Sequence, residues 1–256
     1  MTDLQLEIRE LSRSFGGLKA VNDVSFMVRT GSIKSVIGPN GAGKTTLFNL
    51  ISGMLPCDSG IILQNGRDIT GFQPHRIAKL GISRTFQTTK LFSRMTVLEN
   101  VMVGRHPRTR AGFLSGVLNL PWTWKEEREI RERSLELLGI LGLNDAAGEP
   151  ASNLPFGKQR LLEIARALAT EPSLLLLDEP AAGLNIYETR EMADIVLKIR
   201  EWGITVLLVE HDMSLVMDIS DEIVVLNYGR KVAEGEPSQI QRDPEVIRIY
   251  LGGDHA

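Results

Sequence analysis

The first third of the chain is dominated by strand-like patterns. Apolar and polar residues alternate over 4–8 and over 24–28, which is the period of half-buried strands. Residues 33–37 are predicted as a short strand that leads into a glycine-rich loop, and residues 45–52 after that loop have helical spacing. Residues 60–66 combine an apolar stretch with an Asn-Gly pair that is typical of a hairpin turn. The pattern predicts a strand–loop–helix unit beside an antiparallel β edge.

The middle third has a helical pattern. Residues 95–103 and 125–141 are predicted as helices, and the second begins with acidic residues before its apolar stripe. Residues 159–170 gather their apolar side chains on one helical face. Residues 105–124 mix Gly, Pro, Trp and Arg without a period, so we expect a loop or a surface excursion there.

The last third alternates strands and helices. The predominantly apolar segments 174–177, 204–209 and 222–226 have the length of strands, and the helical segments 187–201 and 213–219 join them. Continuous apolar strands joined by helices are typical of a parallel sheet with both faces covered. The predicted fold class is therefore α/β.

Composition narrows the class of protein. The 256 residues include 29 Lys and Arg against 32 Asp and Glu, a formal net charge of −3. This balance argues against a non-specific nucleic-acid binder, which needs a basic surplus. The single cysteine, Cys57, excludes an internal disulfide framework and favours a reducing compartment. No run approaches the ~20 apolar residues of a membrane helix, and the first residues lack the apolar block of a signal peptide. We expect a soluble, cytoplasmic chain.

A phosphate-binding motif lies between the predicted strand at 33–37 and the helix at 45–52. It matches G-x-x-x-x-G-K-[ST] in full, in the strand–loop–helix context that this motif requires. Glycines let backbone N–H groups wrap a phosphate, and the helix N-terminus favours the anion. We expect Lys44 to reach the β- and γ-phosphates, Thr45 to give its hydroxyl to Mg²⁺, and Thr46 to donate to a further phosphate. The predicted nucleotide-binding residues of the loop are Gly38, Pro39, Asn40, Gly41, Ala42, Gly43, Lys44, Thr45 and Thr46.

Two acids follow the apolar run at 174–177. A strand end places its last side chains at the carboxyl edge of the sheet, where nucleotides bind in open α/β folds. Asp178 suits the Mg²⁺ shell, and Glu179 suits orienting the attacking water. Without a phosphate loop upstream, solvated acids at a strand end would be the better interpretation.

Two further polar residues end strand-like segments. His211 follows the run at 204–209, where its imidazole could touch a γ-phosphate, and Gln87 ends the segment 82–87. The Gln87 amide oxygen could bind Mg²⁺ or position a water. Each signal is weak alone, because a lone His in a turn is more often a surface residue. The predicted catalytic residues are Glu179, His211 and Gln87, and the predicted metal ligands are Thr45, Gln87 and Asp178.

In their order, these motifs resemble the nucleotide-binding subunit of ABC transporters over nearly the whole chain. The resemblance implies a P-loop NTPase core, with a mixed sheet and an antiparallel β edge, and an inserted all-α helical subdomain. It places the core at 1–87 and 171–235, the helical signature subdomain at 88–170, and a C-terminal helical tail at 236–256. It also implies that Phe15 stacks on the adenine of ATP. A core phenylalanine is the competing interpretation.

The resemblance implies a head-to-tail dimer with ATP between one subunit's phosphate loop and the other's signature segment. The family's usual signature is Leu-Ser-Gly-Gly-Gln, but this chain has Leu-Pro-Phe-Gly-Lys followed by Gln159. The serine hydroxyl is absent and Pro155 has no backbone N–H, so two donors are missing. The Gly157 N–H and the helix dipole remain. The signature residues expected to contact nucleotide are Leu154, Pro155, Phe156, Gly157 and Lys158.

Three segments resemble the importers of branched-chain amino acids more narrowly: 154–168, 178–185 and 246–252. The excursion at 105–124 and the long tail are similar to the larger of their two ATPase subunits. This resemblance implies hydrolysis of ATP with Mg²⁺ to power import. It also implies transmembrane permease subunits, a second ABC ATPase subunit in a homo- or heterodimer, and a solute-binding protein as partners. The place of action would be the cytoplasmic face of the inner membrane, with no nucleic-acid partner.

Other classes share parts of this pattern. Importers of urea, amides or other amino acids share much of it. A soluble ABC ATPase acting on ribosomes or DNA usually has two cassettes or long coiled coils, whereas this chain has one cassette and no heptad run. A non-ABC kinase or GTPase is disfavoured, because no Asn-Lys-x-Asp guanine motif is present and a kinase need not carry a signature helix.

Overall fold

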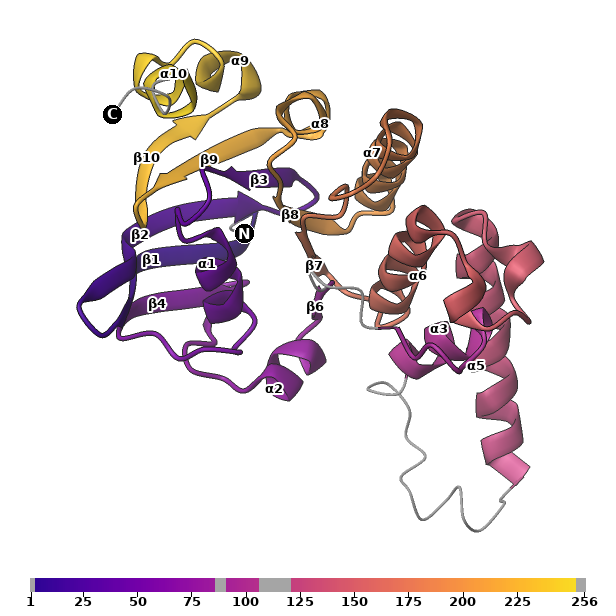
Figure 1. The fold of residues 1–256 in the computed structure, drawn as a ribbon. Helices are drawn as coiled ribbons and strands as arrows, with labels where there is room; N and C mark the ends of the chain where they lie inside the picture. Colours follow the sequence, from indigo (N-terminus) through magenta and orange to yellow (C-terminus); the bar gives the residue numbers. More distant parts are fainter. Residues whose placement is uncertain (1–2, 86–90, 106–120, 252–256) are drawn as a thin grey trace. The chain divides into compact units, whose positions relative to one another are not determined.

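The computed structural model describes residues 3–85, 91–105 and 121–251. Contacts divide the chain into two compact units, one formed by Met1–Ile77 with Ser173–Ala256 and the other by Ala78–Pro172. Figure 1 follows the chain through both units. The described residues contain no helix that is both long and apolar enough to cross a membrane.

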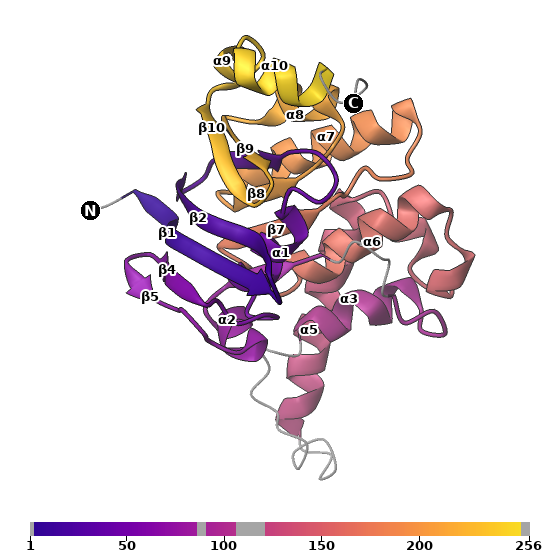
Figure 2. The ribbon, with the colours of Figure 1, turned by 60° about the vertical axis from the view of Figure 1, so that its left-hand side comes forward.

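The first unit contains a four-stranded antiparallel sheet in the order β2-β1-β4-β5. Figure 2 shows these strands side by side. Their bounds are β1 (Leu4–Phe15), β2 (Leu18–Arg29), β4 (Ser59–Gln64) and β5 (Arg67–Asp68). The Asn-Gly pair forms the turn between β4 and β5, and both of its residues have positive φ, as a type I′ turn requires. The predicted antiparallel β edge is confirmed.

Strand β1 is longer than its alternation predicts. The pairing with β2 changes register between Ile8 and Leu11, and Glu10 at this irregularity has φ 49°. A bulge puts one extra residue into a strand and breaks the period of two. The prediction therefore stopped at residue 8, although the strand continues to Phe15.

The first unit also holds five strands of a mostly parallel sheet, in the order β10-β9-β3-β8-β7. Strand β3 is central and parallel to both β8 and β9, β7 is parallel to β8, and β10 is antiparallel to β9. Every residue of β3, β7 and β8 is buried, which explains the largely apolar sequences of β7 and β8, whereas β3 also buries Lys34 and Ser35. The bounds are β3 (Ile33–Ile37), β7 (Leu174–Asp178), β8 (Thr205–Val209), β9 (Glu222–Asn227) and β10 (Arg230–Gly235).

In the first unit, α1 (Lys44–Ile51), α7 (Ile186–Glu201) and α8 (Met213–Ile219) follow strands β3, β7 and β8, and α9 (Pro237–Ile240) and α10 (Pro244–Leu251) both follow β10. Asn185 caps α7 with a capping box, and the Asp212 side chain caps α8. Val246 of α10 packs into an apolar cluster with Ile37, at the end of β3, and with side chains of α8 and β9. The predicted α/β class is confirmed.

The second unit is mainly helical. Helix α3 (Val97–Arg105) packs against α5 (Pro121–Ile140) and α6 (Phe156–Leu168). A Cβ at Gly104 would lie 2.2 Å from the Arg166 carbonyl oxygen, so glycine allows α3 to approach α6 closely. Short strand β6 (Ile82–Arg84) belongs to this unit, and helix α2 (Pro74–Lys79) lies at the boundary of the two units. Most of the predicted 105–124 excursion lies outside the described residues, but α5 starts within it, at Pro121.

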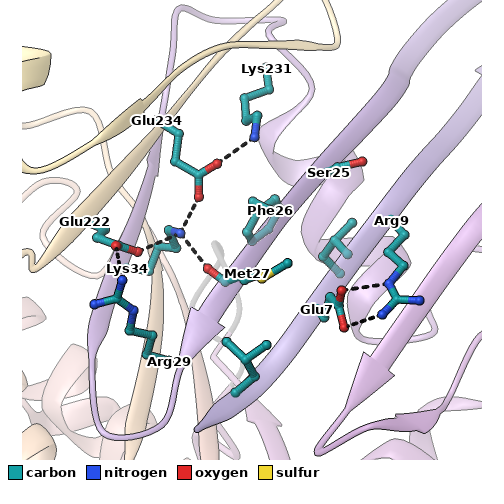
Figure 3. Close-up of a pocket in the computed structure, with 12 residues that line it drawn as sticks. Glu7, Arg9, Ser25, Phe26, Met27, Arg29, Lys34, Glu222, Lys231 and Glu234 are labelled. Carbon is teal, nitrogen blue, oxygen red and sulfur yellow. Dashed lines mark hydrogen bonds and ion pairs between the residues drawn. The ribbon is translucent and has the colours of Figure 1, made fainter. Parts of the chain in front are cut away.

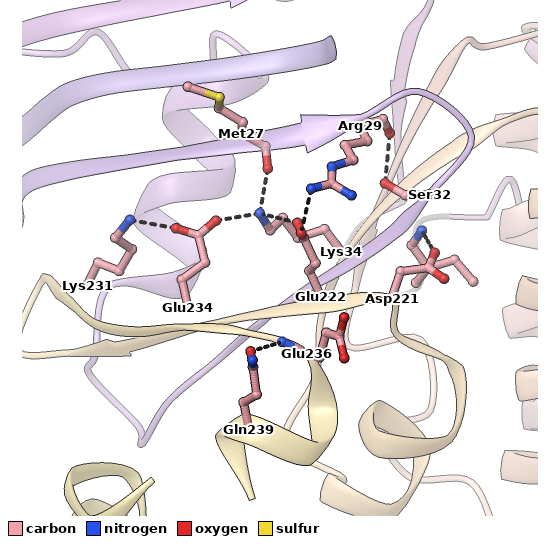
Figure 4. Close-up of polar contacts among 11 residues, drawn as sticks. Met27, Arg29, Ser32, Lys34, Asp221, Glu222, Lys231, Glu234, Glu236 and Gln239 are labelled. Carbon is pink, nitrogen blue, oxygen red and sulfur yellow. Dashed lines mark hydrogen bonds and ion pairs between the residues drawn. The ribbon is translucent and has the colours of Figure 1, made fainter. Parts of the chain in front are cut away.

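A buried lysine connects the two sheets of the first unit. The Lys34 side chain on β3 is 2% exposed, and its ammonium donates to the Met27 carbonyl oxygen of β2 at 2.5 Å. It also pairs with Glu222 of β9 at 2.9 Å and Glu234 of β10 at 2.5 Å. A cavity of about 400 Å³ lies beside these residues (Figure 3), and Figure 4 shows the contacts from the neighbouring strands. The three acceptors compensate the burial of the charge.

Candidate nucleotide site

The predicted phosphate loop connects β3 to α1. The Lys44 ammonium bends back over the loop and donates to the carbonyl oxygens of Gly38, at 2.6 Å, and Pro39, at 3.1 Å. Burial lowers the pKa of Lys44, while the charges of Glu179 and Asp178 act in the opposite direction. The loop is therefore folded around a lysine that faces two carboxylates.

Two glycines of the loop cannot be replaced without strain. Gly43 is the N-cap of α1 with φ 104°, and a Cβ there would lie 2.3 Å from the Ala20 carbonyl oxygen. Gly38 has φ 150°, and its Cβ would lie 2.1 Å from the Leu226 carbonyl oxygen. These positions need glycine both for the backbone angle and for the close approach of neighbouring strands.

The other loop residues differ in exposure. Ala42 is buried, whereas Asn40, Gly41 and Thr45 are exposed, and Thr46 is half-buried. The Ala42 carbonyl accepts from the Gly229 N–H at the β9–β10 turn, at 2.9 Å. The loop therefore opens to solvent on one side and is attached to the protein on the other.

The C-terminal helix also reaches the phosphate loop. Burial raises the pKa of Tyr250, on α10, to about 12, and a backbone hydrogen bond from Gly38 acts in the opposite direction. Local sequence patterns do not indicate this contact, because helix α10 is separated from the loop by about 200 residues and only the fold brings them together.

The acids and the histidine meet at one edge of the sheet. Strand β8 lies between β3 and β7, so the residues that follow these three parallel strands are neighbours. Asp178, the last residue of β7, is 1% exposed. Glu179 has φ 49°, and its carboxylate oxygen Oε2 lies 3.9 Å from Nδ1 of His211. The His211 side chain is 59% exposed. The structure thus brings together Lys44, Asp178, Glu179 and His211.

Glu210 is a residue of this edge that the sequence analysis did not select. It directly follows β8 and is fully buried, at 0% exposure. Its carboxylate accepts backbone hydrogen bonds from Ala181 at 2.8 Å and His211 at 3.0 Å. Burial raises the pKa of Glu210, and these N–H groups act in the opposite direction. In the sequence it looks like an ordinary solvated acid after a strand, and its place directly before His211 was the only available signal.

Phe15 ends β1 with its ring 45% exposed. The Arg13 guanidinium lies over the ring, 5.0 Å from its centroid. This exposure argues against the alternative interpretation of Phe15 as a core side chain. Gln87, the remaining predicted residue outside the signature segment, lies outside the described residues.

The signature segment belongs to the second unit. Pro155 is the N-cap of α6 and makes no side-chain cap, and the Leu154 carbonyl accepts from Nε2 of Gln159 at 2.9 Å. The Phe156 ring is 46% exposed, with the Arg160 guanidinium 5.3 Å from its centroid. Leu154 and Gly157 are buried, and Lys158 is exposed. The segment presents an aromatic ring, a lysine and a helix N-terminus on its surface.

Comparisons with known proteins agree with this geometry. A sequence model described as ABC transporter matches residues 21–182. The high-affinity branched-chain amino acid transport ATP-binding protein BraF of Pseudomonas aeruginosa is 46% identical over 248 residues, which cover 96% of this chain and 97% of BraF. The chain belongs to the ABC transporter family. It is an ATP-binding and ATP-hydrolysing subunit of that family.

Further matches extend the family assignment to both ends of the chain. The ATP-binding protein LivG of Escherichia coli K12 is 45% identical over 253 residues, covering 98% of this chain and 99% of LivG. A second sequence model, described as branched-chain amino acid ATP-binding cassette transporter, matches residues 230–256. The ADP conformation of an ABC transporter cassette superposes with a TM-score of 0.85 at 35% identity, covering 97% of this chain and 99% of that one. The resemblance and the fold predicted from the motifs are confirmed.

Proposed function

We propose that this ABC subunit hydrolyses ATP to power the import of branched-chain amino acids. The observation that carries the ATPase chemistry is the meeting of Lys44, Asp178, Glu179 and His211 at the ends of three adjacent strands. The cargo class is supported by relatives named as branched-chain amino acid transport proteins and by the match at 230–256. Urea, amides and other amino acids are the alternative cargoes.

The residues of the edge take distinct roles in hydrolysis. The loop N–H groups and Lys44 hold the phosphates and oppose the charge that develops on them. Glu179 orients the attacking water and accepts its proton. His211, close to Glu179 and exposed, donates toward the γ-phosphate, while the exposed Phe15 stacks on adenine. Gln87 is a further residue that we propose positions the attacking water.

The donor set at this edge fits Mg²⁺. The described residues contain no group of three or more His, Cys, Asp or Glu that could hold a metal ion. Mg²⁺ typically uses only one or two protein oxygens together with substrate phosphates. Thr45 and Asp178 of this edge would hold the ion, with Gln87, outside the described residues, as the third expected ligand, and the ion would neutralise charge on the β- and γ-phosphates. Protein and nucleotide would therefore share the coordination shell.

The signature segment completes the site from a second ATPase subunit. Its surface offers the Phe156 ring and the Lys158 charge, and the N-terminus of α6 favours an anion in place of the usual serine hydroxyl. We assign residues 88–170 to the signature subdomain, residues 1–87 and 171–235 to the core, and 236–256 to the tail. An unlike partner with a regular signature would supply the better second site, so a heterodimer is favoured.

The second unit has a groove suited to a permease. It has a volume of about 490 Å³ and is lined by residues of β6, of the segment after β6, and of α3 and α6. The Phe92 ring lies at this groove, with the Arg166 guanidinium 5.7 Å from its centroid. A cytoplasmic permease segment with an apolar anchor and an acidic residue would fit this lining. The subunit would then act as a peripheral protein at the inner face of the membrane, in a complex that also includes a solute-binding protein.

Purification of the tagged chain from native membranes tests these partners. We expect two membrane permeases and a second ATPase to co-purify with the unmodified chain. Arg166→Glu should reduce recovery of the permeases, because it removes the cation over Phe92, while Arg133→Glu on an exposed stretch of α5 should not. Recovery of the chain without any membrane protein would contradict a role in transport.

A further inference from the structure

Glu210 is a buried charge that the hydrolysis scheme above does not use. It is 0% exposed and lies directly after β8, between the strand and His211. A carboxylate is retained inside a protein only where hydrogen bonds replace its lost hydration. The hydrogen bonds of the Glu210 carboxylate therefore indicate which parts of the chain it stabilises.

The two carboxylate oxygens hold two different loops. Oε1 accepts from the Ala181 N–H at 2.8 Å, in the loop that follows β7. Oε2 accepts from the N–H groups of His211 at 3.0 Å and Asp212 at 3.4 Å, in the loop that follows β8. Hydrogen bonds to a charged acceptor are stronger than neutral ones. Glu210 is thus a bridge between the ends of two neighbouring strands.

These two loops carry the side chains assigned to hydrolysis. Glu179 precedes Ala181 by two residues, and its carbonyl accepts from the Ala182 N–H at 3.1 Å. His211 is the residue whose N–H Glu210 holds, and its Nδ1 lies 3.7 Å from Oε2 of Glu210. The separation between Glu179 and His211 consequently depends on both ends of the bridge.

We propose that Glu210 is a positioning residue for ATP hydrolysis, fixing Glu179 and His211 relative to each other through the Ala181 and His211 backbones. Within the described residues, the hydrogen bonds of Glu210 go to Ala181, His211 and Asp212, and none goes to the phosphate loop. Its loss should therefore reduce turnover rather than nucleotide affinity. The loop that begins at Ala181 continues to Asn185, so the same bridge also steadies the segment expected to face the partner ATPase.

Glu210→Gln tests this role with little change of volume. Glutamine has a single acceptor oxygen, and its NH₂ group would face a backbone N–H, so one loop loses its acceptor. We expect kcat of the full-length chain to fall about 10- to 100-fold, because small displacements of reacting groups have effects of that size. The KM for ATP should stay within about twofold, since nothing that binds the phosphates is removed.

A double variant distinguishes positioning from general stability. In a Glu179→Gln background, Glu210→Gln should reduce turnover little further, because its effect acts through Glu179. Glu234→Gln, a half-buried carboxylate of the Lys34 cluster, serves as the control and should leave kcat unchanged. The proposal would be overturned if the double variant's loss in kcat equalled the product of the two single losses. It would also be overturned if Glu210→Gln raised the KM for ATP as well as lowering kcat, or if that chain did not fold.

This inference rests on the role proposed for Glu179, and the single variants separate the two. If Glu179→Gln hydrolyses ATP at the unmodified rate, the assignment of Glu179 fails. If Glu179→Gln is inactive while Glu210→Gln is as active as the unmodified chain, only the role of Glu210 fails.

Discussion

At the scale of single residues, the site combines side chains that motifs identify with side chains that only the fold identifies. The phosphate loop and the Asp178–Glu179 pair could be predicted because each has a fixed spacing and sits at the end of an apolar strand. Glu210 could not, because a buried acid and a solvated acid after a strand have the same sequence. The exposure of Phe15 also needed the structure.

Lys44→Ala should remove most of the nucleotide affinity. The ammonium now lies against two loop carbonyls and is available to phosphates at the same place. Charge-assisted hydrogen bonds of about 1.5–3 kcal/mol correspond to about a 10- to 100-fold weaker Kd, and hydrolysis should fall below detection. Calorimetric titration with ATP measures this.

Lys198→Ala, at an exposed position of α7, is the matched control and should bind ATP normally. An unchanged Kd for the Lys44 variant would remove this lysine from the site.

At the scale of elements, Lys34 links the two sheets of the first unit through three polar contacts. Its strand was predicted, but a lysine within a five-residue strand does not by itself indicate that its side chain is buried and paired. The pairing depends on β9 and β10, which are about 190 to 200 residues away in the chain. Long-range partners of this kind explain why local patterns found β3 but missed β10 and the continuation of β1.

Lys34→Met should destabilise the fold strongly. It leaves Glu222 and Glu234 without their shared cation, and breaking a buried ion pair typically costs about 3–5 kcal/mol. Lys231→Met removes a more exposed partner of Glu234 and should cost about 1 kcal/mol or less. Urea unfolding measures both values, and equal losses for the two variants would contradict the role of Lys34 as the central link.

The same cluster predicts a dependence of stability on pH. Burial acts to raise the pKa of Glu234, but its hydrogen bonds from Lys231 and Lys34 and their charges outweigh this, so its pKa lies below the ordinary value of 4.5. A carboxyl with a lowered folded-state pKa stabilises the fold above 4.5, and the contribution is lost as the pH falls through the folded-state pKa.

Between about pH 7 and about pH 3.5, the free energy of unfolding measured with urea should therefore fall less for Glu234→Gln than for the unmodified chain. If both proteins lose the same free energy of unfolding over this range, Glu234 is not a source of the pH dependence.

At the scale of the whole molecule, the chain is a two-unit cassette with a phosphate loop on one unit and a signature segment on the other. The order of motifs along the sequence predicted this family and its fold. Pro155 departs from the family's usual signature in the segment where we propose that a second ATPase subunit shares the nucleotide.

Transport by the reconstituted complex tests the central claim most directly. The chain, its co-purified permeases and its partner ATPase would be placed in proteoliposomes with the solute-binding protein outside and ATP inside. The account predicts uptake of leucine, isoleucine and valine that requires ATP and is abolished by Glu179→Gln, with binding of ATP retained. Uptake that does not depend on ATP or survives Glu179→Gln, or ATP-driven uptake of urea or amides in place of these amino acids, would contradict it.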